Sequence, residues 1–158
     1  MSFTLIVLMF AIGVIAGLRS MTAPAVVSWA AHLGWLALPN THLALLGTTP
    51  AVVILTLFAL AELIVDKLPA TPNRTTTGPL VGRIGTGALC GAALCVAADR
   101  SLALGILLGS LGAIAGAFGG YQARRELVKS LRVPDIFVAL VEDCIAVGGG
   151  FFIVSRLR

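Results

Sequence analysis

Two pairs of carboxylates stand within otherwise apolar stretches of this sequence. In the first pair, Glu62 and Asp66 are four residues apart, which places both side chains on one face of a helix. A helix that ends at Lys67 and Pro69 leaves Glu62 roughly 10 Å inside that end. An ionised carboxylate at that depth in a membrane costs at least a few kcal/mol, so Glu62 is expected to be protonated, paired or exposed to a polar cavity. For Asp66 and Lys67, a position at the membrane boundary explains the sequence equally well.

The second pair, Glu142 and Asp143, lies about 12 Å along a helix that starts at Pro134. Consecutive residues of a helix point about 100° apart, so the two carboxylates cannot both face one narrow site. One is expected to bond a neighbouring helix while the other lines a cavity. Because the two carboxylates repel each other at low dielectric, at least one of them is expected to hold a proton more readily, which suits proton exchange. The alternative is a neutralised pair bonded to Arg19 or to another basic group.

Arg19 follows small and aliphatic residues and precedes Ser20, Met21, Thr22 and Pro24. This order resembles a broken helix, whose exposed backbone could hold an anion or a carboxylate. The alternative is an interfacial arginine that reaches lipid phosphate. The positions above predict a polar centre that serves as a substrate or ion pathway, formed by Arg19, Glu62, Asp66, Lys67, Glu142 and Asp143.

The composition shows which class of protein must position these charges. Hydrophobic residues make up 58% of the 158 residues and charged residues 11%, against about 25% charged in a globular domain. The mean hydropathy of +1.03 applies to the whole chain and excludes a soluble domain with one anchor. The net charge of +4 is spread over several loops, so nucleic acid is not an expected partner. We predict an all-α, polytopic transmembrane helical bundle in the lipid bilayer, with residues 1–158 as one domain.

Six apolar segments approach the length of about 20 residues that a spanning helix needs. They cover residues 2–18, 22–38, 50–66, 79–98, 101–121 and 135–155. The second segment is short and contains His32, so it either spans at a tilt or re-enters from one side. The first is expected to be a retained helix, because it lacks the basic start of a cleaved signal peptide.

Two further patterns concern the arrangement of these segments. The basic loops 67–78 and 122–134 are expected in the cytoplasm, with both termini outside. Phe58–Glu62 resembles Val138–Glu142. A duplication would give a 3+3 inverted repeat, as in many secondary transporters; a five-residue match in apolar sequence also arises by chance.

Glycines recur at a spacing of four in several segments. The fifth segment has Gly105, Gly109, Gly112, Gly116 and Gly120, and the pairs Gly13/Gly17, Gly78/Gly82 and Gly87/Gly91 repeat the spacing elsewhere. Such rows of small residues allow helices to approach closely, within one chain or across a homodimer.

Sites typical of soluble enzymes are not recognisable. Cys90, Cys95 and Cys144 lack C-x-x-C spacing and are expected to be small buried side chains. His32 and His42 are ten residues apart, which is not a metal-ligand spacing. The sequence contains neither a phosphate-binding loop nor a hydrolase grouping. No cofactor, metal or catalytic residue is therefore expected, and the chain is not expected to be an enzyme.

The polar positions also resemble those of a known family. Gly17-Leu18-Arg19, the segment Glu62–Pro69, and Pro134 followed by Glu142-Asp143 are similar to the small bacterial membrane proteins grouped as domain of unknown function 4126. The resemblance covers nearly the whole chain and implies a multi-pass inner-membrane protein. It implies no particular substrate, cofactor or catalytic residue.

The expected function is that of a small secondary transporter or channel-like permease for a small ion or solute. Protonation of a carboxylate would alternate with an ion pair to Arg19 or Lys67 and so favour one of two helix arrangements. An accessory membrane protein, whose charges serve helix packing or partner binding, is the alternative. A lipid-modifying enzyme that uses a divalent metal is least expected, because the sequence lacks an aspartate-rich cluster. A homodimer is compatible with so short a chain.

Overall fold

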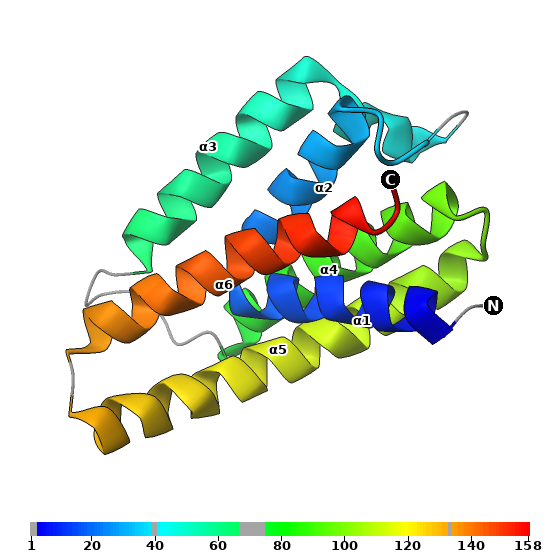
Figure 1. The fold of residues 1–158 in the computed structure, drawn as a ribbon. Helices are drawn as coiled ribbons and strands as arrows, with labels where there is room; N and C mark the ends of the chain where they lie inside the picture. The colour runs from blue at the N-terminus through cyan, green and yellow to red at the C-terminus, as the bar shows by residue number, and fades with distance from the viewer. Residues whose placement is uncertain (1–2, 39–40, 67–74, 133) are drawn as a thin grey trace.

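The computed structural model describes residues 3–38, 41–66, 75–132 and 134–158. Within these ranges the chain forms six α-helices and one 3-10 helix and contains no strand (Figure 1). In chain order they are α1 (Phe3–Leu18), α2 (Thr22–His32), the 3-10 helix η1 (His42–Gly47), α3 (Thr49–Val65), α4 (Thr77–Ala97), α5 (Leu102–Leu131) and α6 (Asp135–Ser155). The prediction of an all-helical protein is confirmed.

The second predicted segment does not form one long helix. α2 ends at His32, and Gly34 follows with a φ of +74°, a left-handed conformation that glycine adopts at little cost and that commonly ends helices. The N–H groups of Trp35 and Leu36 donate back to the carbonyl of Ala30 at 2.8 and 3.2 Å. With 11 residues, α2 is only about 16 Å long.

The fifth predicted segment is too short, because α5 continues to Leu131. The region predicted as the loop 122–134 is therefore mostly helical. Residues 122–130 contain no glycine or proline and include several good helix formers. The helix stops where Arg132 adopts a φ of +52°, two residues before Pro134, which cannot continue a helix from its own position.

Three helices, α4, α5 and α6, are long enough and apolar enough to cross a membrane. α1 and α3 are apolar but shorter, at 16 and 17 residues. Large apolar side chains also lie on the outside of the bundle: Leu57 is 60% exposed, Phe137 58% and Phe152 57%. A lipid-facing surface has this character, whereas a soluble monomer rarely exposes so much apolar area. These features suggest a membrane protein.

Glycines bring α1, α4 and α5 into backbone contact. A Cβ added to Gly109 of α5 would lie 2.1 Å from the carbonyl oxygen of Gly87 in α4, and one added to Gly91 would lie 2.2 Å from that of Gly105. A Cβ at Gly13 of α1 would lie 2.2 Å from the carbonyl oxygen of Gly109, which a Cβ at Gly87 also approaches, to 2.6 Å. No larger residue fits at these positions, so the three helices form one tightly packed unit.

The same spacing at Gly78 and Gly82 has no such role, because a Cβ at either position would meet nothing within 4 Å. Both residues lie in the first two turns of α4. Spacing alone therefore does not identify which glycines pack against another helix.

α3 lies at the side of the bundle, where it packs mainly against α2 and η1 (Figure 1). Among its 17 residues only Val52 and Ala59 are buried. A hydrogen bond of 3.0 Å from Trp29 Nε1 of α2 to Thr56 Oγ1 joins the middle of the two helices. In Figure 1 both termini lie at one end of the bundle, and the end of α3 and the start of α6 lie toward the other.

Candidate functional site

The turn at residues 19–21, between α1 and α2, is the centre of the site. A helix leaves its last carbonyls and its first N–H groups without partners, so this turn exposes both kinds of group within a few residues. Arg83 of α4, which is 4% exposed, donates hydrogen bonds to two carbonyls at the end of α1. Its Nη1 lies 2.9 Å from Gly17 O and 2.7 Å from Leu18 O. A cation at the C-terminus of α1 also complements the helix dipole.

Glu62 of α3 accepts hydrogen bonds from the N–H groups at the N-terminus of α2. Its Oε1 accepts from the backbone N–H of Ser20 at 2.7 Å and from the Ser20 hydroxyl at 2.8 Å. Its Oε2 accepts from the backbone N–H of Met21, the N-cap residue, at 2.8 Å. Arg83 Nη2 lies 3.9 Å from Oε1. The carboxylate is thus held by three hydrogen-bond donors and one guanidinium, at the end of a helix that favours negative charge.

Arg19 joins two helices that are far apart in sequence. Its side chain is completely buried, forms a hydrogen-bonded ion pair with Asp66 of α3, and lies 2.5 Å from Oδ1 of Asp143 of α6. Arg83 Nη2 lies 3.8 Å from Asp66 Oδ2. Through the two ion pairs of Arg19, the turn between α1 and α2 is connected to the end of α3 and to the middle of α6.

Arg124 of α5 forms the outer part of the cluster. It binds Asp135, at the start of α6, through both carboxylate oxygens, with 2.7 Å between Nε and Oδ1. Its Nη1 lies 3.6 Å from Oε2 of Glu142. Asp143 pairs with Arg19 and Glu142 with Arg124, so the two neighbouring carboxylates bind different cations, as their divergent directions on the helix predict.

The structure brings together five of the six residues predicted as the polar centre. They are Arg19, Glu62, Asp66, Glu142 and Asp143. Lys67, the sixth, lies outside the described residues. We define the charged cluster as these five residues together with Arg83, Arg124 and Asp135.

Sequence reasoning missed the last three residues of the charged cluster. Arg83 is absent from the predicted polar centre, although it lies inside the predicted segment 79–98, where a charge is as costly as in the other segments. Arg124 was placed in a loop because the length of α5 was underestimated. For Arg83 the signal was present in the sequence; for Arg124 it depended on where the helix ends.

Charge and hydrogen bonding are not fully balanced in this cluster. Among the described residues, three arginines face five carboxylates. In addition, the Nε of Arg19 and the hydroxyl of Thr22, both fully or almost fully buried, have no hydrogen-bond partner within the described chain. Buried polar groups normally have partners, so these two atoms are exceptions within the site.

Metal binding is not supported by the geometry. In the parts of the chain that the structure covers, no three histidine, cysteine or acidic side chains are grouped as metal ligands. His32 instead contacts the carbonyl of Gly47 through Nδ1 at 2.9 Å. Of the predicted small buried cysteines, Cys90 and Cys95 are buried, whereas Cys144 is exposed, so the prediction for Cys144 was wrong.

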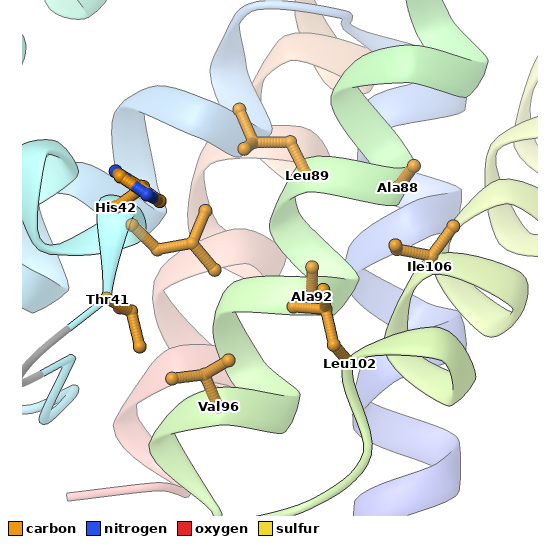
Figure 2. Close-up of a pocket in the computed structure, with 9 residues that line it drawn as sticks. Thr41, His42, Ala88, Leu89, Ala92, Val96, Leu102 and Ile106 are labelled. Carbon is orange, nitrogen blue, oxygen red and sulfur yellow. The ribbon is translucent and has the colours of Figure 1, made fainter.

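A second, apolar hollow lies on α4 away from the charged cluster. The pocket has a volume of about 660 Å³. Figure 2 shows that side chains of α4, of the start of α5, and of η1 with the residue before it line this pocket. Its lining is apolar apart from Thr41 and His42. Leu89 and Val96 line it; along α4 they are about 9 and 20 Å from the level of Arg83.

The fold and the site together define a helical protein with apolar, membrane-length helices and a buried cluster of charges. The family model for domain of unknown function DUF4126 matches residues 6–155, so the chain belongs to this family. No curated protein and no solved structure matches the chain.

Proposed function

We propose that this chain is a multi-pass protein of the bacterial inner membrane that acts as a small secondary transporter or channel-like permease, not as an enzyme. The observation that carries the proposal is the position of Arg19. Its buried guanidinium lies between Asp66 of α3 and Asp143 of α6, at the turn that separates α1 from α2. Ions inside an apolar bundle are costly, so their convergence favours a role in moving ions or solutes.

The proposed moving element is α3. Its outer face is exposed and it has few buried residues, so apolar packing fixes it only weakly. Its C-terminal end is held mainly by polar contacts, from Glu62 to the turn and from Asp66 to Arg19. An element attached in this way changes position at modest cost when the charges change.

Protonation is the proposed switch. A proton taken up from water by Asp66 removes one of the two anions that contact Arg19, which then keeps Asp143. The end of α3 is then held less strongly, and loss of the proton restores the first arrangement. Two arrangements with different affinities for a proton and a solute are what alternating access requires.

The finer architecture belongs to the same proposal. We propose that α1 and α3 cross the bilayer together with α4, α5 and α6, and that the shorter α2 with η1 completes six passes. We also propose a 3+3 inverted repeat, which is supported by the presence of the corresponding residues Glu62 and Glu142 in one charged cluster. A homodimer would cover part of the exposed apolar surface.

Transport in proteoliposomes tests the proposal. Vesicles with a pH-sensitive dye inside, exposed to proton, Na⁺, K⁺, chloride and formate gradients, should show a flux with the native chain. Glu62→Gln and Glu142→Gln should each reduce that flux at least about tenfold, because each removes a charge from the proposed pathway. If both variants leave every detectable flux unchanged, the proposal is wrong.

Glu126→Gln is the matched control for these variants. Glu126 is an exposed acidic residue of α5 with the same side chain and lies outside the charged cluster. Its neutralisation should leave the flux at the native value. An equal loss in this control would indicate a general effect of charge on reconstitution.

An accessory membrane protein is the second candidate, favoured by the ion pairing itself. Every arginine of the charged cluster already contacts a carboxylate, as expected if the charges only hold the helices together. For such a protein, neutralising Arg19 together with Asp66 and Asp143 would change the unfolding temperature in detergent, and no gradient would produce a flux in the native chain.

A further inference from the structure

We propose that the turn between α1 and α2 is a binding site for a small carboxylate anion, that the Glu62 side chain occupies this site when no solute is bound, and that the anion is the transported solute. The inference rests on the proposed transport function and names its class of solute.

The contacts of Glu62 are those that a free carboxylate would make. Its two oxygens accept from the N–H groups of Ser20 and Met21, and the Ser20 hydroxyl adds a third hydrogen bond. The guanidinium of Arg83 lies 3.9 Å away. Backbone donors at a helix start, a hydroxyl and an arginine are the usual partners of bound carboxylates and other oxyanions.

Two further buried donors belong to residues that adjoin Ser20 and Met21 in the chain. The hydroxyl of Thr22, in the first turn of α2, is 3% exposed and has no hydrogen-bond partner among the described residues. Neither has the Nε of Arg19, a residue of the same turn whose side chain is completely buried. An interior donor without a partner is destabilising, so a ligand that contacts one of these groups gains stability that Glu62 does not supply.

The element that carries Glu62 makes displacement feasible. α3 lies at the side of the bundle with two buried residues, whereas the turn itself belongs to α1 and α2, which are packed in the interior. Glu62 is therefore a carboxylate on a helix with few buried residues, and it accepts hydrogen bonds from donors that α1 and α2 hold in place. A free anion competes with it directly when α3 moves away.

Charge balance links anion binding to one proton. If Glu62 takes up a proton from water as it leaves and an anion replaces it, the net charge of the buried site stays the same, which avoids the cost of adding an ion at low dielectric. When the anion leaves, Glu62 loses the proton to water and returns. The other charged groups that face this exchange are Arg83 of α4, Arg19 of the turn, Asp66 of α3, Glu142 and Asp143 of α6, and Arg124 of α5.

Removal of Glu62 should open the site to a small carboxylate. Formate is the probe, because it is a carboxylate with no side chain, and gluconate at the same ionic strength is a carboxylate too large for a buried site. For purified Glu62→Ala in detergent, the unfolding temperature should rise by a few degrees with increasing formate and not with gluconate, since a ligand that binds only the folded state stabilises it. Adding Ser20→Ala should weaken the formate affinity about tenfold, as one charged hydrogen bond is lost.

Glu126→Ala serves as the matched control. It also loses an acidic side chain, but from the exposed side of α5, so formate and gluconate should have equal effects on it. Equal effects of the two salts on Glu62→Ala would overturn the inference. Stabilisation by chloride and not by formate would overturn the carboxylate assignment.

The native chain provides a measurement that needs no variant. Its affinity for formate should rise as the pH falls, by about tenfold per pH unit, because one proton binds with each anion. An affinity that does not change with pH would overturn the inference. A flux of protons or cations that ignores formate would also overturn it, while leaving the proposed transport function in place.

Discussion

Two parts of the bundle are held in place by different interactions. Close backbone packing holds α1, α4 and α5, whereas polar contacts at its end hold α3. Gly13, Gly87 and Gly109 bring three backbones into direct contact, where even a Cβ would not fit. α3 has two buried residues, and its end is held through Glu62 and Asp66. Close packing allows one arrangement of the helices, whereas ion pairs can be released by a proton. The comparison predicts that α1, α4 and α5 stay fixed and that α3 is the element whose position depends on charge.

The largest expected effect is on the glycine-packed unit. Gly109→Leu should prevent folding or lower the unfolding temperature more than any other change considered, because its first side-chain atom would lie 2.1 Å from the backbone carbonyl oxygen of Gly87 and two helix backbones would have to separate. Gly119→Leu is the control on the same helix, since a Cβ there meets nothing within 4 Å. Thermal unfolding in detergent measures both. Equal loss in the two variants would show that close packing does not distinguish this unit.

An intermediate effect is expected at Arg19. Arg19→Met leaves Asp66 and Asp143 without their shared cation, and breaking a buried ion pair in this way typically costs about 3–5 kcal/mol. Unfolding temperature is again the measurement. A triple variant that adds Asp66→Asn and Asp143→Asn should regain much of the lost stability, because the two carboxylates that Arg19 neutralises are then uncharged themselves. If the triple variant is less stable than Arg19→Met, the charge explanation is wrong.

The smallest expected effect is on α3 alone. Asp66→Asn removes the ion pair with Arg19 but leaves Arg19 in contact with Asp143. Amide hydrogen exchange in the last turns of α3 should become about tenfold faster, which corresponds to about 1.4 kcal/mol of local stability. Exchange in α4 and α5 should not change. Faster exchange throughout the bundle would show that α3 and the glycine-packed unit respond as one.

Much of the fold could be predicted from the sequence, because apolar segments and their interruptions are local features. The predicted segments 2–18, 50–66, 79–98 and 135–155 agree with α1, α3, α4 and α6 to within about two residues at each end. The errors arose at helix ends, where Gly34 stops α2 early and where the residues after Tyr121 continue α5 to Leu131. Such ends depend on single backbone conformations, which composition does not determine.

The candidate site was predictable as a set of residues but not as a set of contacts. The cost of burying a charge marks Arg19, Glu62 and Asp143 wherever their partners lie. The sequence does not indicate that Glu62 accepts hydrogen bonds from the backbone of Ser20 and Met21, or that Arg83 lies beside it.

The sequence by itself therefore determined that this is a helical, predominantly apolar protein and that a few charges inside its segments need an explanation. Both follow from the free energy of transferring single side chains, which requires no knowledge of neighbours. Only the tertiary structure decided that Arg19 joins α3 to α6, that Arg83 and Arg124 belong to the same cluster, and that α3 lies at the side of the bundle. These features depend on which helix faces meet, and that choice is made by packing between segments that are distant in the chain.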